Sequence, residues 1–160
     1  MSGKNMRKEM PDAHVTAIEV SDTALEYLRQ NAELNCADIE IIKGDVLDES
    51  LAEKLEQFDI IVSNPPYLSK NDMDNLQTEV SFEPQSALDG GQDGLEYYRK
   101  MTSIWKNKIK PGGLFFYEIG IGQGEEVKEI FLENGFENTE FSRDTADIIR
   151  IVSAYRKQED

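Results

Sequence analysis

The chain has 160 residues, enough for one domain that buries a sizeable core. Its net charge is -15, from 32 acidic and 17 basic residues, which opposes tight binding to the phosphates of nucleic acid. The one cysteine, Cys36, excludes a disulfide within the chain, and there is neither an apolar stretch long enough to span a membrane nor a secretory signal. These features predict a cytoplasmic protein without a membrane partner.

The first part of the chain alternates short apolar strands with amphipathic helices. Residues 1–10 are polar and resemble a remnant or tag-like segment, whereas 11–160 are predicted to form a single domain. A strand is expected over 15–18, ending in Glu19, and Ser21 then suits the N-cap of a helix that ends near Asn35. Next come a strand over 39–42 with a tight exit at Gly44 and Asp45, and a short helix around Leu51 and Leu55.

The run at 59–63 has the length and β-branched content of a buried strand, and Asn64-Pro65-Pro66-Tyr67 follows it directly. The prolines end the strand because neither can donate a hydrogen bond to a sheet. A strand that ends this way holds Asn64 at the carboxyl edge of a sheet, where open α/β folds bind ligands.

This turn suits a planar nitrogen as its ligand. The side-chain oxygen of Asn64 and the carbonyl of Pro65 are two acceptors on a stiff backbone, which could hold both hydrogens of an NH2 group. The Tyr67 ring could pack over the planar group that carries the nitrogen. The alternative is a plain strand-terminating turn, since Asn-Pro and Pro-Pro are ordinary turn dipeptides.

The second part of the chain begins with a polar, turn-rich segment at 68–93, and a segment of this length in a compact domain is usually functional. A helix is expected from about Gly94. It carries four apolar side chains at helical spacing, which favour a core stripe: Leu95, Tyr98, Met101 and Trp105. The alternative is a platform for stacked bases, made by Tyr97, Tyr98 and Trp105.

The remaining elements are a turn at 110–113, a strand at 114–119, a helix from Gln123 to Asn134 closed by Gly135, and strands at 139–142 and 148–154. Strands that alternate with helices and end in a strand pair predict an α/β sandwich with a mostly parallel sheet.

The motif at 64–67 and the residues after it resemble a known family. The downstream matches are Glu83-Pro84, Ala87-Leu88, Gly90-Gly91, Asp93-Gly94-Leu95 and Tyr98-Arg99. With Asn64-Pro65-Pro66-Tyr67 they are similar to HemK-like protein release-factor glutamine methyltransferases, from about Pro11 to the C-terminus. The resemblance implies a Rossmann-like class I methyltransferase sandwich, with strand order 3-2-1-4-5-7-6 and the last strand antiparallel.

The resemblance also implies S-adenosylmethionine as cofactor, no metal, and a release factor as partner, methylated on the glutamine of its Gly-Gly-Gln loop. Glu19 would bind the ribose hydroxyls and Asp45 the adenine amino group, with Val46 packing nearby. For Glu19 the alternative is a solvated strand end, and for Asp45 a Gly-Asp turn. The remaining implied residues serve the substrate and the methyl-transfer site: Asn64, Pro65, Pro66, Tyr67, Glu79 and Glu83, with Asn64 also facing the cofactor.

The family's first strand and the glycine-rich loop after it have no counterpart before Glu19. We therefore expect 11–160 to be an N-terminally truncated, partial methyltransferase catalytic domain with weakened cofactor affinity. The strands ending at Glu19 and Ser63 would expose backbone edges. Direct pairing of these strands, a rearrangement, or a homodimer formed through the exposed edges would close them.

Two other functions share these features. A DNA or RNA amino-methyltransferase also carries Asn-Pro-Pro-Tyr and would hold a flipped adenine in the same way, although the acidic charge makes nucleic acid an unexpected partner. The chain could also be a non-catalytic fragment that serves only as a binding or structural domain.

Overall fold

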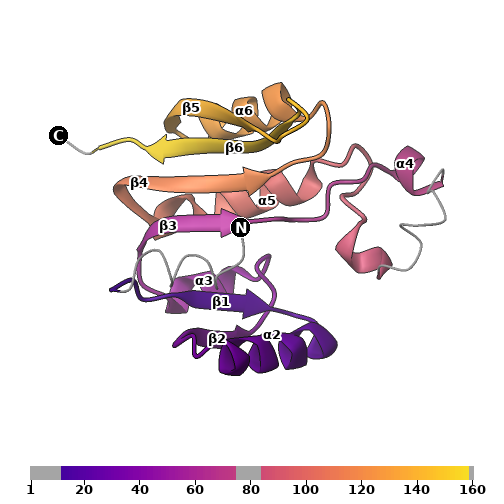
Figure 1. Ribbon diagram of the computed structural model, residues 1–160. Helices are drawn as coiled ribbons and strands as arrows, with labels where there is room; N and C mark the ends of the chain where they lie inside the picture. Colours follow the sequence, from indigo (N-terminus) through magenta and orange to yellow (C-terminus); the bar gives the residue numbers. More distant parts are fainter. Residues whose placement is uncertain (1–11, 75–83, 159–160) are drawn as a thin grey trace. The chain divides into compact units, whose positions relative to one another are not determined.

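The computed structural model describes residues 12–74 and 84–158. The chain divides into two compact units, Met1–Lys54 and Leu55–Asp160, and each has its own sheet (Figure 1). The expectation that 11–160 forms a single domain stays a prediction. Within the described ranges, no helix combines the length and the apolar character needed to cross a lipid bilayer.

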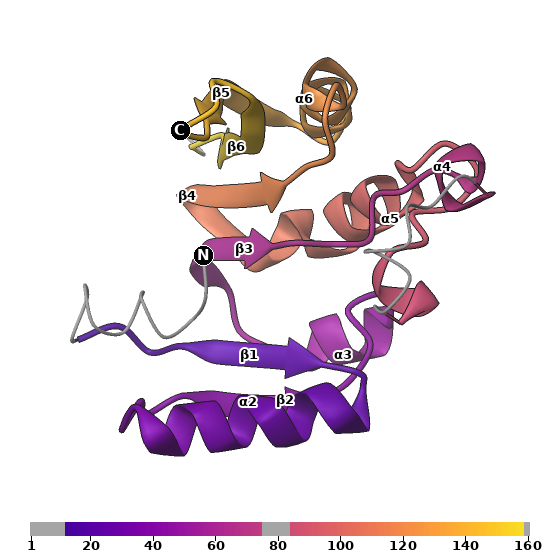
Figure 2. The ribbon, with the colours of Figure 1, turned by 45° about the vertical axis from the view of Figure 1, so that its right-hand side comes forward.

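The first unit is built on two parallel strands joined by a helix. Its elements are β1 (Thr16–Glu19), α2 (Asp22–Leu34), β2 (Glu40–Lys43) and α3 (Glu49–Lys54). α2 runs alongside the two strands and contacts both, with Leu25 buried (Figure 2). It begins where predicted because the Ser21 hydroxyl accepts a hydrogen bond from the Ala24 N–H at 3.3 Å. Glu19 lies opposite Lys43 at the carboxyl ends of the two strands.

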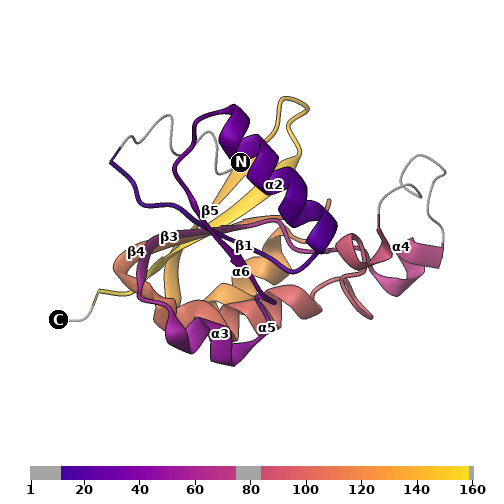
Figure 3. The ribbon, with the colours of Figure 1, turned by 90° about the horizontal axis from the view of Figure 1, so that it is seen from below.

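The second unit is a four-stranded sheet with helices on one face. Its elements are β3 (Phe58–Ser63), α4 (Lys70–Asp74), η2 (Gln85–Ala87), α5 (Glu96–Trp105), η3 (Lys106–Lys108), β4 (Ile109–Glu118), α6 (Gly124–Glu133), β5 (Phe136–Arg143) and β6 (Ile149–Arg156). The strand order is β3-β4-β6-β5, with β3 parallel to β4 and β6 antiparallel to both of its neighbours. This is the order and direction that the resemblance implies for the last four strands. α5 and α6 cover the same face of this sheet (Figure 3).

The predicted core stripe on α5 is confirmed. Tyr98 is 0% exposed, Trp105 2% and Met101 4%, and Leu95 is also buried. A base cannot stack on a ring that is fully covered, so the alternative of a stacking platform is wrong for Tyr98 and Trp105.

Aromatic rings fill the space between this sheet and its helices. The Tyr117 ring stacks on Phe131 with 5.2 Å between ring centres and meets Tyr98 edge to face at 5.0 Å. The Thr102 hydroxyl donates to the Tyr98 carbonyl at 2.6 Å, so the Tyr117 hydroxyl, 3.0 Å away, donates to Thr102. Burial raises the pKa of Tyr117 and keeps its hydroxyl protonated.

The turn predicted at 110–113 lies inside a longer strand. β4 begins at Ile109, and its register against β3 passes from Phe58↔Ile109 to Ile60↔Leu114. Residues 110–113 therefore lie opposite Asp59 alone, as a bulge in which Gly112 adopts a φ of 77°.

The composition of β3 predicted a buried strand, but the strand is less buried than that: Val62, for example, is 37% exposed. In the part of the chain that the structure describes, β3 pairs only with β4 and forms an edge of its sheet, whereas β1 pairs only with β2. Direct pairing of the strands that end at Glu19 and Ser63, and a rearrangement that closes their edges, stay predictions. A homodimer through these edges stays a prediction.

The Thr102 hydroxyl offers a test of the core. We expect Thr102→Val to lower the free energy of unfolding by about 1–3 kcal/mol, because it leaves the buried Tyr117 hydroxyl without its partner. Adding Tyr117→Phe should recover part of this loss, since no unsatisfied hydroxyl then remains. Denaturant unfolding followed by the fluorescence of Trp105, the single tryptophan, measures both effects. A double variant whose loss equals the sum of the two single losses would contradict the hydrogen-bond explanation.

Candidate active site

The diproline turn, residues 64–67, directly follows β3. Pro65 is buried, Asn64 is exposed, and Tyr67 is half-buried. Neither the Asn64 side chain nor the Pro65 carbonyl has a hydrogen-bond partner among residues 12–74 and 84–158. Within the described residues both acceptors thus keep their hydrogen-bonding capacity, which suits a ligand that carries hydrogen-bond donors.

A second segment holds this turn from its far end. The Leu68 N–H donates to the Leu88 carbonyl at 2.9 Å, and the Gly90 N–H donates to the Leu68 carbonyl at 2.8 Å. Gly90 lies against the turn so closely that a Cβ there would be 2.8 Å from the Cα of Tyr67 and 2.9 Å from the Pro66 carbonyl oxygen. Only glycine permits this backbone approach.

The Tyr67 ring is held by the turn that follows β4. A Cβ added at Gly120 would lie 2.9 Å from Cδ2 of the Tyr67 ring, so the ring packs directly on the backbone there. Tyr67 as a whole residue is half-buried, so the contact with Gly120 does not cover it completely.

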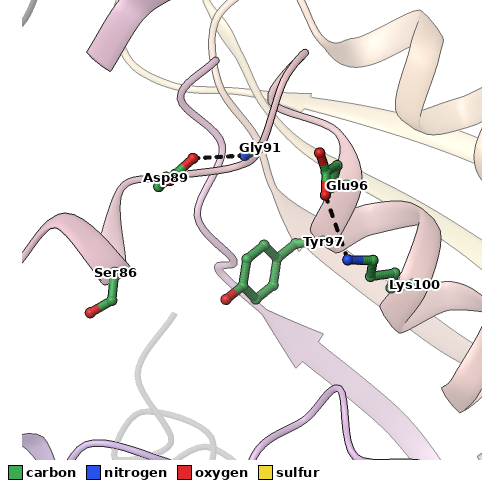
Figure 4. A pocket seen from close by; sticks show the side chains of 6 residues that line it. All are labelled: Ser86, Asp89, Gly91, Glu96, Tyr97 and Lys100. Carbon is green, nitrogen blue, oxygen red and sulfur yellow. Dashed lines mark hydrogen bonds and ion pairs between the residues drawn. The ribbon is translucent and has the colours of Figure 1, made fainter. Parts of the chain in front are cut away.

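A cavity of about 260 Å³ lies beside residues 86–100, which sequence reasoning did not identify as a pocket. Its lining residues are Ser86, Asp89, Gly91, Glu96, Tyr97 and Lys100 (Figure 4). Asp89 accepts a hydrogen bond from the Gly91 N–H at 2.9 Å, and Glu96 forms an ion pair with Lys100 at 3.5 Å. Asp89 also forms a β-bridge with Leu68, the residue that follows the diproline turn.

The start of α5 is fixed by an ion pair. Arg99 Nη1 and Nη2 donate to the two carboxylate oxygens of Asp93 at 3.1 and 2.6 Å. The Arg99 guanidinium lowers the pKa of the Asp93 carboxyl through this hydrogen bonding. Asp93 and Arg99, one from each of these matching stretches, thus together hold the loop before α5.

Three of the four predicted cofactor residues, Glu19, Asp45 and Val46, belong to the first unit, whereas Asn64 belongs to the second. The Gly44 N–H donates to the Glu19 carbonyl at 3.0 Å, which brings the end of β2 beside Glu19. Glu19 Oε1 accepts a hydrogen bond from the Ser21 N–H at 2.8 Å, and Asp45 Oδ1 accepts one from the Leu47 N–H, also at 2.8 Å. In each carboxylate one oxygen is thus oriented by the backbone. The second oxygen has no partner in the described parts of the chain.

The site residues therefore fall into two groups, one in each unit. Glu19, Asp45 and the half-buried Val46 belong to the first unit, and residues 64–67 belong to the second. Glu79 and Glu83 lie outside the described residues. Gln123 was expected only as the start of a helix, yet its side chain bonds to the Tyr67 carbonyl at 2.9 Å. The one sequence signal for such a contact was a polar residue directly after the Gly120-x-Gly122 pair.

Comparisons with known proteins identify the family of this chain. Residues 2–91 match the family model described as methyltransferase small domain. The chain is 40% identical over 157 residues to a release factor glutamine methyltransferase of Clostridium acetobutylicum, covering 96% of this chain and 55% of that protein. It is 38% identical over 148 residues to the release factor glutamine methyltransferase of Geobacter sulfurreducens, covering 92% of this chain and 51% of that protein. The chain thus spans about half the length of these curated relatives.

A solved structure shows the same fold. The methyltransferase from Pyrococcus furiosus matches with a TM-score of 0.68 and 20% identity, covering 96% of this chain and 68% of that one. The predicted Rossmann-like methyltransferase sandwich is therefore confirmed, as is the resemblance to release-factor glutamine methyltransferases. Because the family model matches more than half of its residues, this chain belongs to the methyltransferase small domain family.

Proposed function

We propose that this chain is the catalytic part of an S-adenosylmethionine-dependent enzyme that methylates the side-chain amide nitrogen of a glutamine in a peptide chain release factor. The observation that carries the proposal is the exposed Asn64 amide beside the buried Pro65, at the end of β3. Support comes from the curated relatives, which are named for this activity.

The diproline turn would bind the glutamine. The Asn64 side-chain oxygen and the Pro65 carbonyl each accept one hydrogen of the substrate NH2 group, and the Tyr67 ring covers the amide plane. Two acceptors discriminate for a primary amide or amine, because a hydroxyl cannot satisfy both of them. Glu79 and Glu83 are proposed to shape the entrance for the peptide.

Orientation is the main contribution of these residues. An amide nitrogen is a weak nucleophile because its lone pair is delocalised into the carbonyl group. A turn that fixes both N–H directions also fixes the direction of the lone pair, and holding one reactive geometry is a large source of rate in enzymes. No side chain needs to act as a strong base before transfer.

The residues of the first unit fit the nucleoside half of the cofactor. The open oxygen of Glu19 suits the ribose hydroxyls, and that of Asp45 suits the adenine amino group, because both ligand groups carry donors. Val46 offers an apolar contact. S-adenosylmethionine, when bound, supplies an electrophilic methyl group.

We further propose that the 160-residue chain by itself binds this cofactor weakly, since no glycine-rich loop precedes Glu19. Such loops bring backbone N–H groups close to the ligand, and carboxylates at strand ends do not replace them. The substrate, a release factor, places the reaction in the cytoplasm.

The first test removes one of the two acceptors. We expect Asn64→Ala to lower kcat/KM for methylation of a glutamine peptide by about 100-fold, because the side-chain amide of the substrate glutamine loses one of the two acceptors that fix its orientation. The matched control is Asn107→Ala, an exposed asparagine of the same unit, which should stay within about twofold. Transfer of tritium-labelled methyl groups measures both. Equal activities of the two variants would refute the role of Asn64.

The second test concerns the cofactor. We expect Glu19→Gln to weaken S-adenosylmethionine binding by about tenfold, because hydrogen bonds to a charged acceptor are stronger than those to an amide. Glu33→Gln, the same change at an exposed position of α2, should have no effect. Titration calorimetry gives both constants. A micromolar affinity of the unmodified chain would contradict the proposed weak binding.

The third test decides between substrates. Labelled methyl transfer to release factor, DNA and RNA is compared for this chain and for a form extended at its N-terminus to the length of the relatives. We expect transfer to release factor alone, and far more of it by the extended form, because the acidic charge of the chain repels nucleic acid. Transfer to nucleic acid would indicate the amino-methyltransferase alternative. No transfer by either form would indicate a non-catalytic domain.

A further inference from the structure

Gln123 stands immediately before α6 but does not cap it. Its backbone occupies the N-cap position of the helix, and its side chain makes no hydrogen bond to the first turn. The half-buried amide reaches instead to three other backbone segments of the second unit.

Both ends of this amide are engaged. Nε2 donates to the Tyr67 carbonyl at 2.9 Å and to the Gly94 carbonyl at 3.3 Å. Oε1 accepts a hydrogen bond from the Gly120 N–H at 3.0 Å. The amide orientation is unambiguous, because two carbonyls lie at one end and an N–H at the other. A single side chain thus links the diproline turn, the loop before α5 and the turn after β4.

The surrounding glycines make room for this amide. A Cβ at Gly94 would lie 2.8 Å from Nε2 of Gln123 and 2.5 Å from the Tyr67 carbonyl oxygen. A Cβ at Gly120 would lie 2.8 Å from Oε1 of Gln123. Gly94 also adopts a φ of 76°, a conformation that other residues rarely adopt. The close approach is therefore built into the backbone on both sides of the side chain.

We propose that Gln123 is a positioning residue for the candidate methyl-acceptor site, which holds the Tyr67 carbonyl and thereby sets the direction of the two acceptors on Asn64 and Pro65. This inference rests on the proposed function of the diproline turn. Pro65 and Pro66 have no N–H, so the turn cannot donate hydrogen bonds through these residues to stabilise itself. Its fixed points are the carbonyl that Gln123 binds and the bridge between Leu68 and Asp89.

The chemistry of an amide is needed at this position. In Gln123→Glu, an ionised carboxylate would face the carbonyls of Tyr67 and Gly94 with no donor, although it could still accept from Gly120. When protonated, the introduced carboxyl group can donate to one of these carbonyls. The nearby Tyr98 hydroxyl, 3.5 Å from Oε1, stays protonated because burial raises its pKa. The facing carbonyls raise the pKa of the introduced group above the ordinary glutamate value, so the defect should appear as pH rises and fade in acid.

The experiment compares Gln123→Glu with Gln57→Glu in the full chain. Gln57 is a matched control, because its exposed side chain also donates to a backbone carbonyl, that of Asn107, at 3.1 Å. Hydrogen exchange of the Leu68 and Gly90 amides reports on the turn without any need for activity. At about pH 8 we expect Gln123→Glu to speed this exchange about tenfold over the unmodified chain, with recovery near pH 5, and Gln57→Glu to change nothing.

Methyl transfer provides the second readout, measured in the N-terminally extended form if that form is the active one. Gln123→Glu should lower kcat about 10- to 100-fold at about pH 8 and leave KM for S-adenosylmethionine unchanged, with partial rescue in acid. Gln123→Leu should lose activity at every pH, because its side chain cannot donate.

The outcomes separate the two proposals. Faster exchange in Gln123→Glu, together with an unmodified protein that methylates no glutamine, would support the role of Gln123 in holding the turn and refute the proposed function. Unchanged exchange at Leu68 and Gly90, or an active Gln123→Glu with normal kcat at high pH, would overturn the positioning role. Trp105 fluorescence during unfolding identifies a variant that does not fold. If Gln123→Glu does not fold, exchange at Leu68 and Gly90 is measured in Gln123→Leu instead, and unchanged exchange there would overturn the positioning role.

Discussion

The candidate site in the second unit depends on the contacts that hold the diproline turn, residues 64–67, in one conformation. The rings of Pro65 and Pro66 fix their own φ angles but contribute no N–H groups, so the hydrogen bonds that hold the turn in place come from its neighbours. The bonds from Leu68 to Leu88 and from Gly90 to Leu68 secure one end, and at Gly90 the backbone packs too closely against the turn to admit a Cβ atom. A stiff acceptor pair at the end of β3 follows from these contacts.

Four of the candidate site residues each offer a hydrogen-bond acceptor. Asn64 and Pro65 offer two oxygens in the second unit, and Glu19 and Asp45 each keep one open carboxylate oxygen in the first. Ligands rich in N–H and O–H groups suit such a set, whereas phosphates do not. This agrees with the proposed amide as methyl acceptor and the proposed nucleoside as the group bound by the carboxylates, in a chain with a net charge of -15.

The aromatic interior of the second unit supports its candidate site through backbone atoms. The Tyr98 hydroxyl donates to the Glu118 carbonyl at 3.0 Å, which ties α5 to the end of β4. Gly120 and Gln123 lie in the turn between β4 and α6, and Gly94 precedes α5. The packing of Tyr98 against Tyr117 thus locates the very segments that meet the diproline turn. Changes in this core should therefore be felt at the site as well as in stability.

Local signals in the sequence determined most of the element types, the cap at Ser21, the buried stripe on α5 and the position of Asn64 after a strand, because each depends on neighbours a few residues apart. Tertiary structure decided the rest. The bulge at 110–113 exists because β4 must stay in register with β3, and Val62 is exposed because β3 lies at an edge. Gln123 meets Tyr67 across 56 positions of sequence, and no local pattern encodes a contact between residues so far apart, since only the folded sheet brings those segments together.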